Sequence, residues 1–152
     1  MISKEGLEKI RKITKEFFQK TTFDVSLDFS TQEENTLLIE VKTEDPQILI
    51  GERGQTLADI QHLLKIILRK KTEELFYVNV DVNDYKKKKA EYLKELANSV
   101  ADDVILTKEE KALSPMRAFE RRIVHMELAE RSGVITESIG ERDERKVVVK
   151  PS

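Results

Sequence analysis

The stretch Gly51-Glu52-Arg53-Gly54 has residue types and spacing that could hold a phosphate group. Glycine lacks a Cβ atom, so a sugar-phosphate backbone can approach the peptide closely at such positions. The positive end of a following helix would then face the phosphate. GxxG also occurs in turns that bind nothing, so a helix–helix turn without a ligand is the alternative interpretation. Its placement between two predicted helices favours binding.

Four consecutive lysines occupy residues 86–89, in the first turns of a predicted long helix. Positive charge at a helix N-terminus opposes the macrodipole and costs a few tenths to about 1 kcal/mol per residue. A phosphate partner would account for the run, and Lys86 and Lys87 are its candidate contacts. The alternative is a solvated face that keeps the protein soluble.

Arg121 and His125 are four residues apart and therefore project from one face of a predicted helix. A guanidinium fork and an imidazole both suit a phosphate oxygen. We expect this face to point away from the core, because the predicted buried stripe of the same helix is apolar: Met116, Phe119, Ile123 and Met126. The alternative is an exposed face with local ion pairs to Glu120 or Glu127.

Little other chemistry is available to this chain. It has no cysteine and two histidines, which excludes disulfides, thiolate metal sites and cysteine nucleophiles. It contains no phosphate-binding Walker loop, nucleophile elbow or dinucleotide-binding GxGxxG. We therefore expect no catalytic residue, no metal ligand and no cofactor, and we do not expect an enzyme.

Hydrophobic periodicity gives the elements that must position these residues. The predicted elements before the lysine run are a helix over 3–20 with Ser3 as N-cap, strands over 23–29 and 37–41, a short helix over 46–50, a helix after Gly54 and a strand over 76–82. Beyond them we expect a long helix with an Asn83-Asp84 N-cap, a strand near Ala112-Leu113, a helix opened by Pro115 and a hairpin over 134–150. The order predicts an α+β fold.

The stretch Leu49 to Leu57 around the GxxG loop resembles the signature of the K homology (KH) domain, and the element order resembles its type II variant. The resemblance implies a three-stranded sheet with helices on one face and a site for single-stranded RNA or DNA. The loop would clamp about four backbone nucleotides, beside an aliphatic groove to which Ile50 and Leu57 contribute. Loops of this family usually carry basic residues between the glycines. Glu52 departs from that pattern, so we expect modest affinity.

The second half of the chain resembles the R-three-H domain, a small α/β domain associated with single-stranded nucleic acids. The likeness rests on Leu113 to Met116, the helix that carries Arg121 and His125, and the closing hairpin. The predicted boundaries are 1–83 for the KH domain and 84–152 for the R-three-H domain, which is entered through the basic helix. The combination resembles the bacterial Jag (SpoIIIJ-associated) family, without the N-terminal domain of many members.

The Jag resemblance implies an RNA chaperone or post-transcriptional regulator linked to cell elongation, division or sporulation. It also implies a homodimer or a heterodimer with a small single-KH protein. The alternative function is an assembly module whose KH surface dimerises, with nucleic-acid binding incidental. Glu52 in the loop and the net charge of −2 favour this alternative slightly, although residues 46–71 hold five bases against two acids. No apolar run is long enough for a membrane span, so we expect a cytoplasmic protein.

Overall fold

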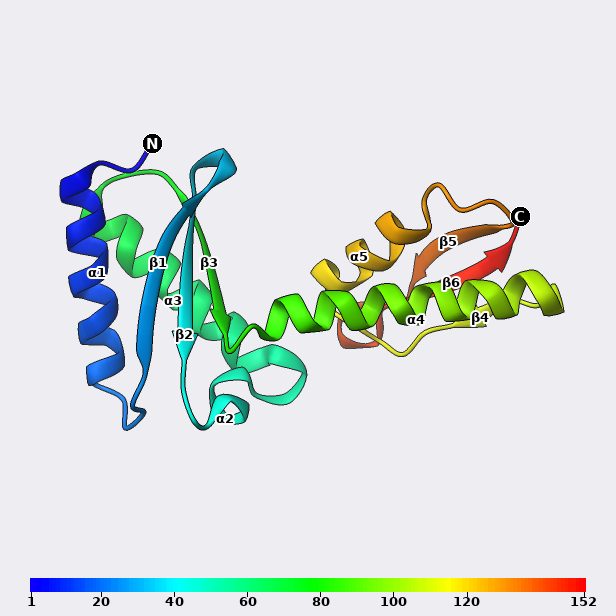
Figure 1. Ribbon diagram of the computed structural model, residues 1–152, viewed down its shortest axis with the longest axis horizontal. Coiled ribbons are helices and arrows are strands. Elements are labelled where there is room, and N and C mark those ends of the chain that lie inside the picture. The colour runs from blue at the N-terminus through cyan, green and yellow to red at the C-terminus, as the bar shows by residue number, and fades with distance from the viewer. The chain divides into compact units, whose positions relative to one another are not determined.

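The computed structural model describes residues 1–152, which form two compact units, Met1–Lys86 and Lys87–Ser152 (Figure 1). The division falls three residues after the predicted boundary at residue 83. The first two residues of the long helix therefore belong to the first unit. None of the helices combines the length and the apolar composition needed to cross a membrane.

The first unit is a three-stranded sheet with helices packed on one face. Its elements are α1 (Lys4–Gln19), β1 (Ser26–Gln32), β2 (Thr36–Lys42), α2 (Pro46–Ile50), α3 (Gln55–Thr72) and β3 (Tyr77–Val82). The strand order is β1-β2-β3, with β1 antiparallel and β3 parallel to β2. Figure 1 shows α3 behind the three strands. Every second residue of β2 and β3 is buried beneath the helices, as the alternating sequence predicts: Leu37, Ile39, Val41, Val78, Val80 and Val82.

The start of α1 confirms the predicted cap. The Ser3 side chain accepts a hydrogen bond from the Gly6 N–H at 2.9 Å. The Glu74 carboxylate, in the loop before β3, accepts hydrogen bonds from the Ser3 hydroxyl and N–H. These hydrogen bonds lower the pKa of Glu74. The first helix is thus tied at its N-terminus to the loop that leads into β3.

The second unit packs two helices on a small antiparallel sheet. Its elements are α4 (Tyr85–Thr107), β4 (Lys111–Ala112), α5 (Ala118–Leu128), β5 (Val134–Ile139) and β6 (Lys146–Pro151), with strand order β4-β6-β5. The predicted closing hairpin is confirmed, since β5 and β6 pair along their whole length. The core combines residues of α4, α5 and β6: Leu93, Ala97, Ala101, Val104, Val124, Leu128, Val147 and Val149.

The predicted cap of α4 at Asn83-Asp84 is wrong. The N–H of Lys86, in the first turn, is bonded instead by the Asp81 carboxylate at 3.0 Å. The Asn83 side chain is used elsewhere, because it exchanges two hydrogen bonds with the main chain of Thr43 and joins the ends of β2 and β3. The acid that caps the helix therefore comes from the preceding strand.

The predicted start of α5 is also wrong, and its predicted buried stripe is only half right, since Met116 and Ile123 pack against the core but Phe119 and Met126 do not. The helix begins at Ala118 rather than at Pro115. Its buried residues are Glu120, Val124 and Leu128, whereas Phe119 is 38% and Met126 67% exposed. A carboxylate is normally exposed to solvent. Glu120 is buried because its carboxylate accepts a hydrogen bond from the Arg117 N–H and caps the start of the helix. The helix is therefore rotated from the predicted orientation.

Candidate nucleic-acid interface

The GxxG loop is a tight turn between α2 and α3 in which both glycines have a positive φ. Gly51 has φ +73° and ψ −177°, and a Cβ atom there would lie 2.9 Å from the main-chain nitrogen of Thr56. Gly54 has φ +76°, and its Cβ would lie 3.3 Å from the ring of Tyr85. The two residues between them, Glu52 and Arg53, are exposed. The loop therefore presents one carboxylate and one guanidinium to solvent.

The two predicted groove residues differ in accessibility. Ile50, the last residue of α2, is half-buried, so part of its side chain remains at the surface. Leu57 is 2% exposed and belongs to the core of the first unit, so its side chain offers no surface to a base. Ile48 on α2 is 57% exposed and adds apolar surface that the sequence pattern did not single out.

The bases along α3 do not gather at the loop. Both Nε and Nη2 of Arg69 donate to the carbonyl oxygen of Phe76, at 3.1 and 2.9 Å, so this guanidinium holds the start of β3. Lys70 and Lys71 are exposed at the other end of the helix. At 1.5 Å per residue they lie about 25 Å along the axis from Gly54. Of these bases and Arg53, only Arg53 lies within the loop.

The structure separates the two predicted lysine contacts. The Nζ atom of Lys86 donates to Gln61 Oε1 at 2.6 Å and to Asn79 Oδ1 at 2.7 Å. Burial lowers the pKa of this ammonium group, and the Asp81 carboxylate partly offsets that effect. Lys86 is thus a structural tie between α3, β3 and α4. Lys87 is exposed, as a phosphate contact would need to be.

Arg121 and His125 lie on the same side of α5, each held by a specific contact. Nη1 of Arg121 donates to the carbonyl oxygen of Met116 at 2.7 Å, which fixes one end of the guanidinium. The ring nitrogens of His125 are both bonded by hydroxyls of β5, Nδ1 to Thr136 at 2.7 Å and Nε2 to Ser138 at 2.6 Å. The imidazole is therefore clamped between helix and strand and is half-buried.

A second guanidinium group, that of Arg145, belongs to this cluster. Burial, followed by the charges of Arg121 and Arg145, lowers the pKa of His125. Arg145 lies just before β6, and its Nη1 donates to the Gly140 carbonyl at 2.8 Å. Thr136, Ser138 and Arg145 were not predicted from the sequence. The alternation of β5 could have indicated the two hydroxyls, because residues 134, 136 and 138 share the face of the strand that packs toward α5.

In the neutral imidazole one ring nitrogen donates and the other accepts, so one of the two hydroxyls must donate to the ring. When the ring is protonated, both nitrogens donate and both hydroxyls become acceptors. The hydroxyl hydrogens are then free to turn to another acceptor, such as a phosphate oxygen. The cluster can thus present two hydroxyl donors beside a positively charged ring and two guanidinium groups.

Two family models match the chain. Residues 8–82 match the KhpA/KhpB KH domain, and residues 91–151 match the R-three-H domain. The chain is 35% identical over 126 residues to the RNA-binding protein KhpB of Clostridium symbiosum, covering 83% of this chain and 56% of that protein.

Two further relatives of the same name give similar values. The RNA-binding protein KhpB of Lactiplantibacillus plantarum is 35% identical over 84% of this chain and 39% of its own length. That of Bacillus subtilis is 34% identical over 80% of this chain and 60% of its own length. This chain spans about half the length of these curated relatives. With a KH domain followed by an R-three-H domain, and with this similarity over most of its length, the chain belongs to the Jag family, that of the KhpB proteins.

Proposed function

We propose that this chain binds single-stranded RNA without catalysing a reaction, and that each unit holds the phosphate backbone. The observation that carries the proposal is the clamped cluster of Arg121, His125 and Arg145, where cations converge although the whole chain is slightly acidic. The relatives are RNA-binding proteins by name, which supports the proposal further. In the first unit, the exposed Arg53 between two glycines would hold the phosphate and Ile50 would contact a base.

The cellular role that we propose is that of an RNA chaperone or post-transcriptional regulator acting in the cytoplasm, linked to cell elongation, division or sporulation. Single-stranded DNA has the same phosphate chemistry. A DNA oligonucleotide of the same sequence in the same titration tests whether the 2′-hydroxyl contributes to binding.

The salt dependence of binding tests the phosphate contacts directly. The logarithm of the affinity for single-stranded RNA should fall with the logarithm of salt concentration, by about 0.7 per phosphate neutralised. Arg121→Ala should weaken binding and reduce this slope by about that amount. Fluorescence anisotropy of a labelled oligonucleotide measures both values. Arg122→Ala, an exposed neighbour on the same helix, is the matched control. An unchanged slope for Arg121→Ala would remove this residue from the interface.

The affinity for RNA should also rise as the pH falls. The pKa of His125 lies below its ordinary value of 6.5 in the free protein. A bound phosphate favours the imidazolium and raises that pKa, so the complex binds more protons than the free protein. Affinity should therefore increase as the pH is lowered through and below 6.5, and level off below the pKa of the free imidazole. His125→Gln should show a flatter profile in the same anisotropy titrations, whereas His62→Gln should keep it.

A second candidate function, assembly through the KH unit, is favoured by one observation. The outer side of α3 exposes Leu63 and Ile66 to 49% and 50%, one turn apart. Burying such a patch against a second copy or a small KH protein would stabilise a dimer. The wild-type chain should then sediment as a dimer, and the Leu63→Lys variant should have a sedimentation coefficient closer to that of a monomer. If the wild-type chain already sediments as a monomer, self-association through α3 is excluded.

A further inference from the structure

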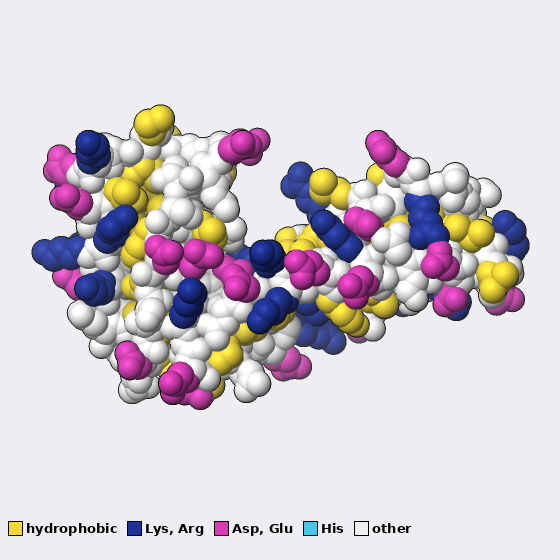
Figure 2. All heavy atoms as spheres, in the orientation of Figure 1, with side chains coloured by type: hydrophobic (Ala, Val, Ile, Leu, Met, Phe, Trp, Pro, Cys, Tyr) yellow, Lys and Arg dark blue, Asp and Glu magenta, His cyan; other side chains and the backbone are white.

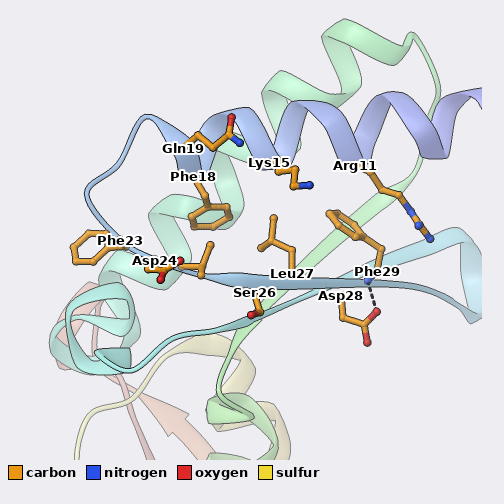
Figure 3. A pocket seen from close by; sticks show the side chains of 11 residues that line it. Arg11, Lys15, Phe18, Gln19, Phe23, Asp24, Ser26, Leu27, Asp28 and Phe29 are labelled. Atoms are coloured by element: carbon orange, nitrogen blue, oxygen red, sulfur yellow. Dashed lines mark hydrogen bonds between the residues drawn. The ribbon is translucent and has the colours of Figure 1, made fainter.

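The outer edge of β1 is a free sheet edge beside a hollow. β1 pairs with β2 on one side and has no strand on the other. A hollow of about 530 Å³ lies between this edge and α1. Figure 3 shows it from close by, with Arg11, Lys15 and Phe18 on the helix and Leu27 and Phe29 on the strand. The apolar row of β1 is only half-buried, so it is accessible from the edge.

The two edges of this sheet are protected to different degrees. On β3, the N–H of Val80 is bonded by the Gln61 side chain of α3, and that of Val82 by its own neighbour Asp81. Lys86 of α4 bonds both of these side chains, a cover from helices that β1 lacks. On β1, the N–H of Phe29 is bonded only by the exposed carboxylate of its own neighbour Asp28, at 3.0 Å. An unpaired strand edge is a template for pairing with another chain. The edge of β1 is therefore the open one.

The helix side of the hollow is basic. Arg11 and Lys15 are one turn apart, and both are exposed. Neither takes part in a salt bridge, and the Arg11 guanidinium lies 5.7 Å from the centre of the Phe29 ring. An extended segment added to β1 would point every second side chain toward these two cations and the apolar floor. Acidic and apolar side chains fit there.

The other face of the same edge is acidic. Asp28 is opposite Glu40 on β2, and Glu40 is opposite Asp81 on β3, so three carboxylates form a row across the open face of the sheet. Figure 2 shows acidic side chains gathered across the middle of this face. Like charges directly opposite each other are destabilising. At the start of β1 a second hollow is lined by one base, Lys42, and by four acids: Asp24, Glu44, Asp45 and Asp84. Basic side chains fit this face.

We propose that the edge of β1 is a docking site for an extended protein segment that adds as a fourth strand. The segment would carry acidic and apolar residues on the face toward α1, and lysine or arginine on the face that continues the acidic row. Main-chain hydrogen bonds would supply affinity, and the two oppositely charged faces would set the register. This site lies outside the GxxG loop and the surface contributed by Leu63 and Ile66.

The charges disfavour two other occupants. RNA is a polyanion, and the same edge carries the carboxylates of Asp24 and Asp28. A second copy that paired edge to edge about a two-fold axis would bring its own Arg11 and Lys15 to the junction, so the cations of the two helices would repel. A segment with acidic residues on one face and basic residues on the other avoids both the repulsion from the carboxylates and the repulsion between the helices.

The test uses the full chain and a labelled peptide in which lysine alternates with glutamate and leucine. The peptide should bind by fluorescence anisotropy and slow amide hydrogen exchange on β1, at Leu27 above all. A peptide of the same composition in scrambled order should bind at least about tenfold more weakly. Arg11→Glu with Lys15→Glu should lower the affinity by a similar factor. The matched control, Lys12→Glu with Lys20→Glu, reverses two exposed lysines of the same region that do not line the hollow, and should leave the affinity unchanged.

Three outcomes would overturn the proposal. The first is a peptide that binds equally well in alternating and scrambled order, or not at all. The second is protection of the β1 amides by single-stranded RNA, with RNA affinity that depends on Arg11 and Lys15. The third is protection that grows with protein concentration in the absence of peptide, which would identify a second copy as the occupant. Circular dichroism of the charge-reversed variant verifies that α1 is retained.

Discussion

Replacing Glu52 and Arg53 together by aspartate should lower the affinity for single-stranded RNA at least about tenfold while the first unit stays folded. Both side chains are exposed between the two glycines, and Asp adopts the positive φ of Arg53, +53°, more readily than most residues. A hydrogen bond to a charged group contributes about 1.5–3 kcal/mol, which corresponds to a factor of about 10 to 150 in affinity. Anisotropy titration at fixed salt measures the change.

The single variant Glu52→Lys should act in the opposite direction. It replaces the one carboxylate of the loop by an ammonium group, so phosphate is attracted where it was repelled. The control for the double variant is Lys70→Asp, which lowers the net charge by the same two units at the far end of α3. If the loop variant and this control reduce the affinity equally, only overall charge matters and the GxxG loop is not part of the interface.

Gly51→Ala should destabilise the first unit by about 2–4 kcal/mol. The combination φ +73° and ψ −177° lies in a region of backbone conformation that is essentially restricted to glycine, and residues forced into such regions cost about 1–3 kcal/mol. The added Cβ would also approach the main-chain nitrogen of Thr56 to 2.9 Å, closer than real contacts allow. Either the turn or the first residues of α3 would have to move. Amide hydrogen exchange of β2 reports the loss of stability in this unit.

Gly54→Ala is the matched comparison for Gly51→Ala. Its φ of +76° and ψ of 16° lie in the left-handed helical region, where a side chain costs about 1 kcal/mol. Its nearest neighbour is the Tyr85 ring at 3.3 Å, which can shift slightly. Equal destabilisation by the two substitutions would contradict the conformation described for Gly51. Because glycine variants alter the fold itself, the substitutions at Glu52 and Arg53 are the better probe of phosphate binding.

The fold class and the family were predictable from the sequence because both depend on local patterns. Alternation with period two marks β1, β2 and β3, and helical spacing marks α1 and α3, so the element order follows from the pattern of apolar residues. The loop between Gly51 and Gly54 adds a short motif at a defined place in that order. Neither inference depends on which residues contact each other across the core.

What could not be predicted depends on contacts between distant segments. Lys86 belongs to a run of lysines, and only the positions of Gln61 and Asn79 on two other elements show that its ammonium is buried. In α5, Glu120 looks like a surface residue until the helix start that it caps is known. Because successive residues of a helix are about 100° apart around its axis, burying Glu120 in place of Phe119 rotates the buried face of α5 by about that angle. The partners of His125 on β5 were missed for the same reason.

The hydrogen bond between the Asp81 carboxylate and the Lys86 N–H has a consequence for the order of folding. Forming the first turn of a helix is the unfavourable nucleation step, because several dihedral angles are fixed for one hydrogen bond. In α4 that turn is held by β3, a strand of the first unit. Once the first unit has formed, the remaining turns of α4 can extend from this turn without a separate nucleation step. The earlier-synthesised half of the chain thus acts as a template for the helix on which the later half assembles.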